Sequence, residues 1–246
     1  MKYLFAAAAM SFLPHNAIAD IASSQAVNLQ VGLVSPKRIP YYWVDQNTQE
    51  VQGLYVDILD KVSELTDIQF DYQFYPQARL RKLVKSGQLD LEPGIDASWR
   101  MEEGEAEASV YTDIFMQSNE VYVFAPEHHV KSPNGDNLKS KVGCGVNGFN
   151  FFDNGNRQIE FEPTTEQQVL MMVAMGRCHY VLVPEIVADH WLTTNPYNIT
   201  VSEDVVSYDL RFRLHKQHHA LLDEVNQAIN TLKQSGELQA LIAKYQ

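Results

Sequence analysis

The stretch that decides the fold runs from Thr165 to Val183 and has the sequence TEQQVLMMVAMGRCHYVLV. Thr165 is suited to cap a helix, and Gln168 stands three residues later, which is the spacing of a capping box. The apolar residues that follow recur at helical spacing until Gly176 interrupts the pattern. The stretch therefore predicts a helix, a glycine stop and a short buried strand that ends at Val183.

The end of the chain predicts a strand and two helices. Leu210 to Lys216 is the strand, and apolar residues from Leu221 to Leu232 then follow at helical spacing. Gly236 breaks this helix, and a final short helix follows through Tyr245.

The first part of the chain alternates between strand and helix patterns. Asn28–Val34 and Gln69–Phe74 alternate as strands do, and Gly53 opens a helix between them. Pro76 suits the first turn of the next helix, which ends at Gly87. A short strand from Leu89 to Glu92 follows and ends at Pro93-Gly94. This order predicts parallel strands with helices on both faces of the sheet.

Three further segments stand in a recognisable order. They are GLYVD at 53–57, LVKSGQLD at 83–90 and GIDASWR at 94–100. Two more features belong to the same pattern: the unit at 165–183, in which Gly176 and Arg177 stand between a helix and a strand, and the helix break at Lys233-x-x-Gly236. Together these segments resemble the family 3 periplasmic solute-binding proteins, the amino-acid-type receptors of ABC transporters. The resemblance covers nearly the whole chain after the first 19 residues.

The resemblance implies a fold class and a domain organisation. The expected fold is α/β, of the type II periplasmic-binding-protein class, with two lobes of parallel-rich sheet flanked by helices and joined by a two-strand hinge. Lobe 1 is expected to hold residues 20–118 and 210–246, and lobe 2 residues 119–209. Ligands in such folds bind at the carboxyl ends of strands, between the lobes.

The N-terminus has the pattern of a secretory signal peptide, residues 1–19. Lys2 supplies a positive charge, Tyr3 to Leu13 is apolar, and Ala17-Ile18-Ala19 is a small-x-small cleavage signal. The apolar run is too short to span a bilayer, which takes roughly 20 residues. The mature protein is therefore expected to begin at Asp20 and to lie in the periplasm.

The charge balance limits the partners. The formal net charge is −12 and becomes −13 once Lys2 is removed. An acidic chain without a basic stripe argues against nucleic acid and against anionic lipid surfaces. The expected partners are a small-molecule ligand and an ABC transporter permease or a membrane sensor, with the protein itself a monomer.

No cofactor is expected, and no metal site. The histidines at His128-His129 and at 215, 218 and 219 lack a nearby cysteine or carboxylate at a known ligand spacing. Solvated histidines are the favoured interpretation.

Cys144 and Cys178 are the two cysteines of the chain. An exported protein permits a disulfide between them. If Lys141–Gly145 and His179–Val183 are neighbouring parallel strands, however, Cys144 lies late in one and Cys178 precedes the other. An offset of about four residues at ~3.3 Å each then exceeds the ~7 Å Cα separation that a disulfide tolerates. The sequence therefore favours two reduced, packed cysteines.

Arg100 is the leading candidate for a ligand-binding residue. A planar guanidinium can bind a carboxylate through two parallel hydrogen bonds, and Arg100 matches the family arginine that holds the ligand carboxylate. The alternative is an exposed arginine paired with Glu102 or Glu103. Asp96 stands where the family has a threonine, and Ser98 can supply the missing hydroxyl.

The second lobe departs further from the family pattern. Where the family has an aspartate for the ligand ammonium, this chain has Pro184 followed by Glu185. The loop from Gly145 to Asn150 matches the family's anion-binding loop at a helix start, which makes Asn147 and Phe149 candidates. Phe149 replaces the usual threonine. Standard α-amino acids are therefore expected to bind poorly.

Secondary candidates lie on the rim of the first lobe. They are Arg38, Tyr41, Tyr75 and Arg79. The aromatic rings could stack on a planar or cationic group of the ligand. Packing under the loop is an equal alternative for the tyrosines, and an exposed helix position is an equal alternative for Arg79.

Three function classes fit this sequence. The leading one is a non-enzymatic periplasmic receptor that captures a small polar, carboxylate-bearing solute by hinge closure and delivers it to an ABC transporter. The second is a dehydratase-like enzyme on the same fold, with Glu185 or Asp96 as general acid. The third is a soluble partner of a membrane sensor.

Overall fold

The structure is a computed structural model that describes residues 26–133, 135–149 and 158–246. The predicted signal peptide, residues 1–19, and Asn150 of the predicted anion loop lie outside these residues. None of the helices in the described ranges is both long and apolar enough to cross a membrane.

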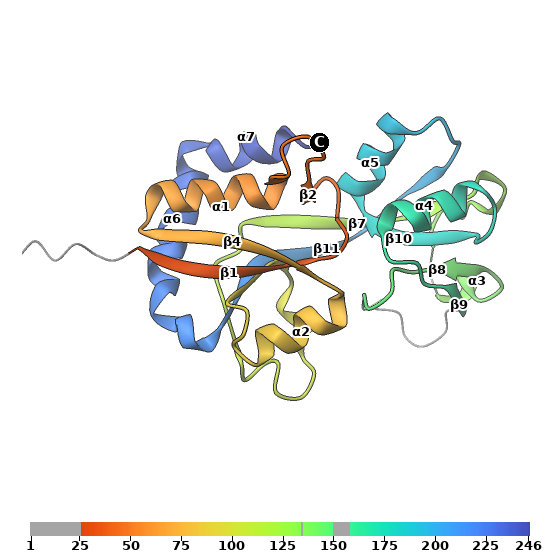
Figure 1. Ribbon diagram of the computed structural model, residues 1–246. Helices are drawn as coiled ribbons and strands as arrows, with labels where there is room; N and C mark the ends of the chain where they lie inside the picture. The colour runs from red at the N-terminus through yellow and green to blue at the C-terminus, as the bar shows by residue number, and fades with distance from the viewer. Residues whose placement is uncertain (1–25, 134, 150–157) are drawn as a thin grey trace, which may run out of the picture.

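Lobe 1 is built on strands in the order β4-β1-β5-β11, with β6 beside β11. β1 pairs in parallel with β4 and with β5, as the alternation of strands and helices predicts. Helices α1 and α7 cover one face of this sheet, and α2 covers the other (Figure 1). The elements are β1 (Val27–Val34), β2 (Trp43–Val44), β3 (Val51–Gln52), α1 (Leu54–Leu65), β4 (Ile68–Tyr75), α2 (Gln77–Lys85), β5 (Leu91–Ile95), the 3₁₀ helix η1 (Ala97–Arg100), β6 (Ser109–Tyr111), the 3₁₀ helix η3 (Lys216–Leu221), α6 (Leu222–Ser235) and α7 (Glu237–Ala243).

Lobe 2 continues the sheet in the order β7-β10-β8-β9. β10 pairs in parallel with β8, and β8 in parallel with β9. The elements of this lobe are the 3₁₀ helix η2 (Pro126–His128), α3 (Gly135–Leu138), β8 (Val142–Cys144), β9 (Gln158–Phe161), α4 (Glu166–Ala174), β10 (Tyr180–Pro184) and α5 (Glu185–Thr194).

Two long strands join the lobes (Figure 1). β7 (Met116–Phe124) and β11 (Thr200–His215) pair antiparallel from Met116 opposite Leu210 to Phe124 opposite Thr200. β11 reaches β5 in lobe 1, while β7 reaches β10 in lobe 2. The predicted α/β fold with two lobes and two crossing strands is confirmed. The boundaries at residues 118/119 and 209/210 stay predictions, because both strands run through them without interruption.

Helix α4 begins as the capping pattern predicts. The Thr165 side chain accepts a hydrogen bond from the Gln168 amide at 3.2 Å, and Gly176 follows the helix in a left-handed conformation (φ 67°). Val169 and Val173 are wholly buried against β7 and β10. The cap, the glycine stop and the apolar face together place the first residues of α4 between the lobes.

Strand β5 runs farther than the sequence suggests. The sequence predicts an end at Pro93-Gly94, but the strand continues to Ile95. A shift of register in the pairing with β11 accommodates this irregular segment. Gly94 adopts a φ of 72°, and a Cβ there would lie 2.3 Å from the Tyr55 ring. Only glycine fits this position, and it lets β5 pass directly over the buried Tyr55.

The expectation of reduced cysteines is wrong. Cys144 and Cys178 form a disulfide with a Cα–Cα distance of 5.9 Å. Cys144 is the last residue of β8, and Cys178 precedes β10, as expected, but lies in a bend. The bend carries Cys178 back toward β8, so an offset counted along two extended strands does not apply.

Candidate functional site

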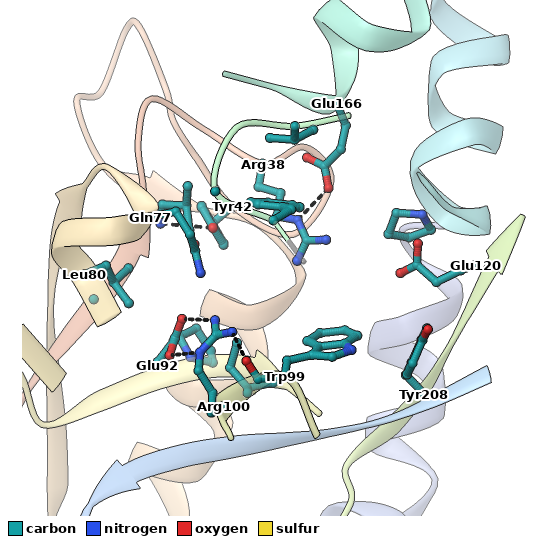
Figure 2. A pocket seen from close by; sticks show the side chains of 18 of the residues that line it. Arg38, Tyr42, Gln77, Leu80, Glu92, Trp99, Arg100, Glu120, Glu166 and Tyr208 are labelled. Atoms are coloured by element: carbon teal, nitrogen blue, oxygen red, sulfur yellow. Dashed lines mark hydrogen bonds and ion pairs between the residues drawn. The ribbon is translucent and has the colours of Figure 1, made fainter. Parts of the chain in front are cut away.

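A cavity lies between the lobes and is lined by residues from both (Figure 2). Lobe 1 contributes side chains from the loop after β1, from α2, from β5 and from η1. Lobe 2 contributes the loop after β8, the start of α4 and the end of β10, and the crossing strands add Glu120 and Tyr208. The cavity has a volume of about 90 Å³, which suits a small solute.

Arg100 lines this cavity and is paired with an internal carboxylate. Its Nε donates to Oε2 of Glu92 at 3.1 Å, and its Nη2 donates to Oε1 at 2.6 Å. Arg100 is 5% exposed and Glu92 is 2% exposed. The pairing with Glu102 or Glu103, given as the alternative, does not occur, since Glu102 instead contacts Arg81 at 2.8 Å.

A second arginine supports Glu92 from behind. Nη1 of the wholly buried Arg213 donates to Oε2 of Glu92 at 2.9 Å. Burial by itself raises the pKa of Glu92, but the guanidinium groups of Arg100 and Arg213 outweigh it and lower the pKa below its ordinary range. Glu92 is therefore an ionised carboxylate held between two cations.

Asp96 and Ser98 position η1 rather than line the cavity. One Asp96 oxygen accepts hydrogen bonds from the Ser98 amide at 2.9 Å and the Ser98 hydroxyl at 2.6 Å. The other accepts from the Asp209 amide of β11 at 2.9 Å. Asp96 thus caps η1 and ties it to a crossing strand, which fixes the place of Arg100 four residues later.

Arg38 connects the lobes across the top of the cavity in Figure 2. Its Nε donates to Oε1 of Glu166, the first residue of α4, at 2.6 Å. Its guanidinium also lies over the rings of Tyr41 and Phe149, at 4.8 and 5.0 Å from their centroids. Arg38, Tyr41 and Phe149 were all predicted as site residues, and the structure brings them together, with Tyr41 buried beneath Arg38.

Glu120 is a cavity residue that the sequence pattern does not reveal. It lies on β7 between Pro184 of β10 and Val206 of β11. Burial raises the pKa of its carboxyl group to about 7, which Arg38 lowers in part and Glu166 raises. The part of the chain that the structure describes offers this carboxylate no hydrogen bond or ion pair.

Aromatic rings border the cavity near Glu120. The Trp99 and Tyr208 rings meet edge to face with centroids 5.0 Å apart. In Figure 2, Tyr208 lies directly below Glu120, and Trp99 lies between Tyr208 and Arg100. Trp99 belongs to the quoted segment at 94–100, but its spacing alone gives no sign that it faces a ligand.

The remaining predicted residues lie away from the cavity lining. Glu185 is exposed at the start of α5 and accepts a hydrogen bond from Nδ2 of Asn119 at 3.1 Å. Asn147 is exposed, while its neighbours Gly148 and Phe149 line the cavity. Tyr75 lies beneath the exposed Arg79, whose guanidinium is 5.1 Å from the ring centroid.

No group of three or more histidine, cysteine, aspartate or glutamate side chains is placed to hold a metal ion in residues 26–133, 135–149 and 158–246. The charged side chains of the cavity are arginines and glutamates, which suits ion pairing with a solute.

The fold and the interlobe cavity define a binding protein of the two-lobed class. The chain belongs to the bacterial extracellular solute-binding proteins, family 3, whose family model matches residues 29–246. This match confirms the resemblance drawn from the ordered motifs. No curated protein matches the chain significantly.

Solved structures share this fold at low sequence identity. A mutant of ArgBP from T. maritima has a TM-score of 0.73 and 18% identity, over 89% of this chain and 94% of that chain. A histidine kinase sensor domain with similarity to periplasmic binding proteins has a TM-score of 0.73 and 16% identity, over 90% and 96%. The ancestral amino acid-binding protein AncCDT-1, a precursor of cyclohexadienyl dehydratase, has a TM-score of 0.73 and 15% identity, over 89% and 95%.

Proposed function

We propose that this protein is a periplasmic receptor that encloses a small polar, amino-acid-like solute between its lobes and delivers it to an ABC transporter. The proposal rests on one observation: the cavity is lined from both lobes and from the strands that join them. A solute that contacts both walls stabilises the closed arrangement over the open one, which is the basis of hinge closure.

Contacts between the lobes support this mechanism. The ion pair of Arg38 with Glu166 spans the cavity, and beside it Nε2 of Gln167 donates to the Ile39 carbonyl at 3.1 Å. Both bonds join the loop after β1 to the first turn of α4. They can form only when the lobes are closed, so they add to the stabilisation that the solute supplies.

The solute class follows from the relatives in part. A solved structure of ArgBP from T. maritima is described as arginine-bound, which suggests an amino-acid-like solute about as large as arginine. The sequence favours a carboxylate-bearing solute held by Arg100, but the structure gives Arg100 an internal carboxylate partner. We therefore keep the amino-acid-like size in the proposal without requiring a carboxylate on the solute.

A thermal-shift screen tests the proposal. The mature protein is heated with amino acids, amines, guanidines, opines and small organic acids. A solute that binds only the native state raises the apparent stability by RT ln(1 + [L]/Kd). Tyr208→Ala, in the cavity, should reduce the shift, while the matched variant Tyr197→Ala, exposed on lobe 2, should not. Equal shifts in both variants would place the solute elsewhere.

Export is part of the proposal. The family is extracellular by description, and the first 19 residues have the pattern of a cleaved signal. Intact-mass analysis of periplasmic material should show a chain that begins at Asp20. A mass that includes residues 1–19 would indicate a tethered protein instead.

An enzymatic function is the second candidate, and Glu120 favours it. A carboxyl group in a cavity with a pKa of about 7 suits a general acid. Glu185 and Asp96, the acids suggested by the sequence, are less well placed, because neither lines the cavity. Turnover of prephenate-like substrates by the wild type, lost in Glu120→Gln, would support this function.

A further inference from the structure

We propose that the cavity selects a small amine or guanidine that carries no carboxylate, with the cationic group of the ligand bound by Glu120 while Arg100 remains paired with Glu92. This inference rests on the proposed solute-binding function and names the chemical class of its solute. It departs from the expectation that the solute is carboxylate-bearing.

The donors of Arg100 are largely engaged. Nε and Nη2 donate to Glu92, and Nη1 donates to the Trp99 carbonyl at 3.0 Å. The Nε/Nη2 edge, which grips a carboxylate through two parallel bonds, is therefore taken by Glu92, and only one N–H on each terminal nitrogen remains for any other acceptor. A ligand carboxylate that approached Arg100 would also meet the negative charge of Glu92.

Displacement of Glu92 by a ligand is unfavourable. Glu92 is 2% exposed and is also bonded to the wholly buried Arg213. Without Glu92, the nearest carboxylate to Arg213 among the described residues is Glu105, at 3.6 Å. Glu105 is already bonded to Arg81, whose Nε donates to it at 3.1 Å, so displacing Glu92 would leave the buried Arg213 only partly compensated, which is unfavourable.

Among the charged side chains of the described residues that line the cavity, one carboxylate is not part of an ion pair with another lining residue. Its lining includes two arginines, Arg38 and Arg100, and three glutamates, Glu92, Glu120 and Glu166. Arg38 pairs with Glu166, and Arg100 pairs with Glu92. Glu120 is the lining carboxylate that neither of these two ion pairs includes. A cation is the ligand that neutralises the charge of this carboxylate.

Aromatic rings beside Glu120 add to the preference for a cation. In Figure 2 Tyr208 lies directly below Glu120 and Trp99 lies between Tyr208 and Arg100, and both rings line the same cavity. Aromatic faces attract ammonium and guanidinium groups, most strongly where water is excluded. The Arg38 guanidinium lies over Tyr41 and Phe149 in this way, which shows the same kind of contact within this cavity.

Titration calorimetry with matched ligands tests the inference. Arginine is compared with agmatine, and lysine with cadaverine, since the members of each pair differ by the carboxylate alone. We expect each carboxylate-free member to bind the mature protein at least about tenfold more tightly. Equal or tighter binding of arginine or lysine would overturn the inference and leave the proposed receptor function standing.

Two variants with one matched control locate the effect. Glu120→Gln should weaken agmatine binding by about tenfold or more, whereas Glu203→Gln, an exposed position on β11, should leave it unchanged. Glu92→Gln frees Arg100 and should shift the preference toward arginine. If Glu92→Gln does not fold, Glu120→Gln and its control Glu203→Gln still decide. Glu120→Gln should fold, because it removes a charge whose burial is unfavourable.

The remaining outcomes are also decisive. Unchanged agmatine affinity in Glu120→Gln would overturn the inference, and so would the failure of all four ligands to bind. If none of the four ligands binds, a thermal shift with a solute of another class would still support the receptor function. A thermal-shift screen in which no solute binds would count against both the ligand class and the receptor function.

Discussion

Nε of Arg38 lies 2.6 Å from Oε1 of Glu166, and this ion pair joins two residues that are 128 positions apart in the chain. Arg38 belongs to lobe 1 and Glu166 begins the first helix of lobe 2 that contacts the cavity. Their side chains are 13% and 3% exposed, so water screens the attraction poorly. The pair acts as a contact that favours the closed arrangement of the lobes.

Arg38→Met should shift the ligand-free protein toward an open arrangement. The variant leaves the Glu166 carboxylate without its partner, and separation of the lobes allows water to reach it. Small-angle X-ray scattering should show a larger radius of gyration than in the wild type, reduced again by a bound solute. Lys61→Met is the control, since it breaks an exposed pair with Glu64 within α1. Equal radii for Arg38→Met and wild type would contradict the role of this contact.

Glu120 should make folding stability depend on pH. Its pKa is about 7 in the folded protein against an ordinary value of 4.5, so the folded state binds more protons between these values. The free energy of unfolding therefore falls as pH rises from about 4.5 to 7, by at most about 1.4 kcal/mol per pH unit. Chemical denaturation of wild type and Glu120→Gln across this window measures the difference.

The groups that face Glu120 set the sign of this effect. Arg38 favours its ionised form, while Glu166 and burial oppose it; the adjacent Tyr41 stays neutral because burial raises its pKa. The strand partners Pro184 and Val206 do not titrate. If Glu120→Gln and the wild type lose stability in parallel across the window, Glu120 does not have the raised pKa.

The disulfide should contribute substantially to stability. It closes a loop with a sequence separation of 34 residues in lobe 2. Chain entropy in the unfolded state then accounts for about 3–4 kcal/mol of unfolding free energy. Thermal unfolding with and without a reductant measures this loss, and a variant with both cysteines changed to serine should not respond to the reductant. Equal stability of reduced and oxidised wild type would refute the bridge.

Gly94→Ala should destabilise lobe 1 more than Gly236→Ala does. Both glycines have positive φ, 72° and 80°, so both variants carry the same kind of backbone strain. At Gly94 the new methyl group also meets the Tyr55 ring, whereas at Gly236 nothing lies within 4 Å. We expect about 1–3 kcal/mol of additional destabilisation from the clash, measured by denaturant titration. Similar losses in the two variants would show that the ring moves aside freely.

Much of the fold could be predicted because its signals are local. The Thr165 cap and Gly176 stop define α4 within a dozen residues, and the order of strands and helices defines the parallel pairing of β1, β4 and β5. The disulfide could not be predicted in this way. It depends on a bend at Cys178 that periodicity does not encode.

The cavity was predicted less completely, because its charges depend on contacts between distant segments. Arg38, Arg100 and Phe149 could be found from motif position and residue type. Their partners are Glu92, which lies in strand β5, and Glu166, which begins helix α4. An acidic residue at a helix start is already explained by the helix dipole, so its position does not indicate a cavity residue. A charged residue in the interior strand β5 was the one available sign, since such positions need a buried partner.

The crystal structure of the mature protein with its tightest-binding solute tests the central claim most directly. The account predicts a solute enclosed between the lobes, with a cationic nitrogen about 3 Å from the Glu120 carboxylate and Arg100 still bonded to Glu92. A solute carboxylate bonded to Arg100, with Glu92 displaced, would contradict the proposed ligand class. A solute bound outside the interlobe cavity would contradict the receptor site itself.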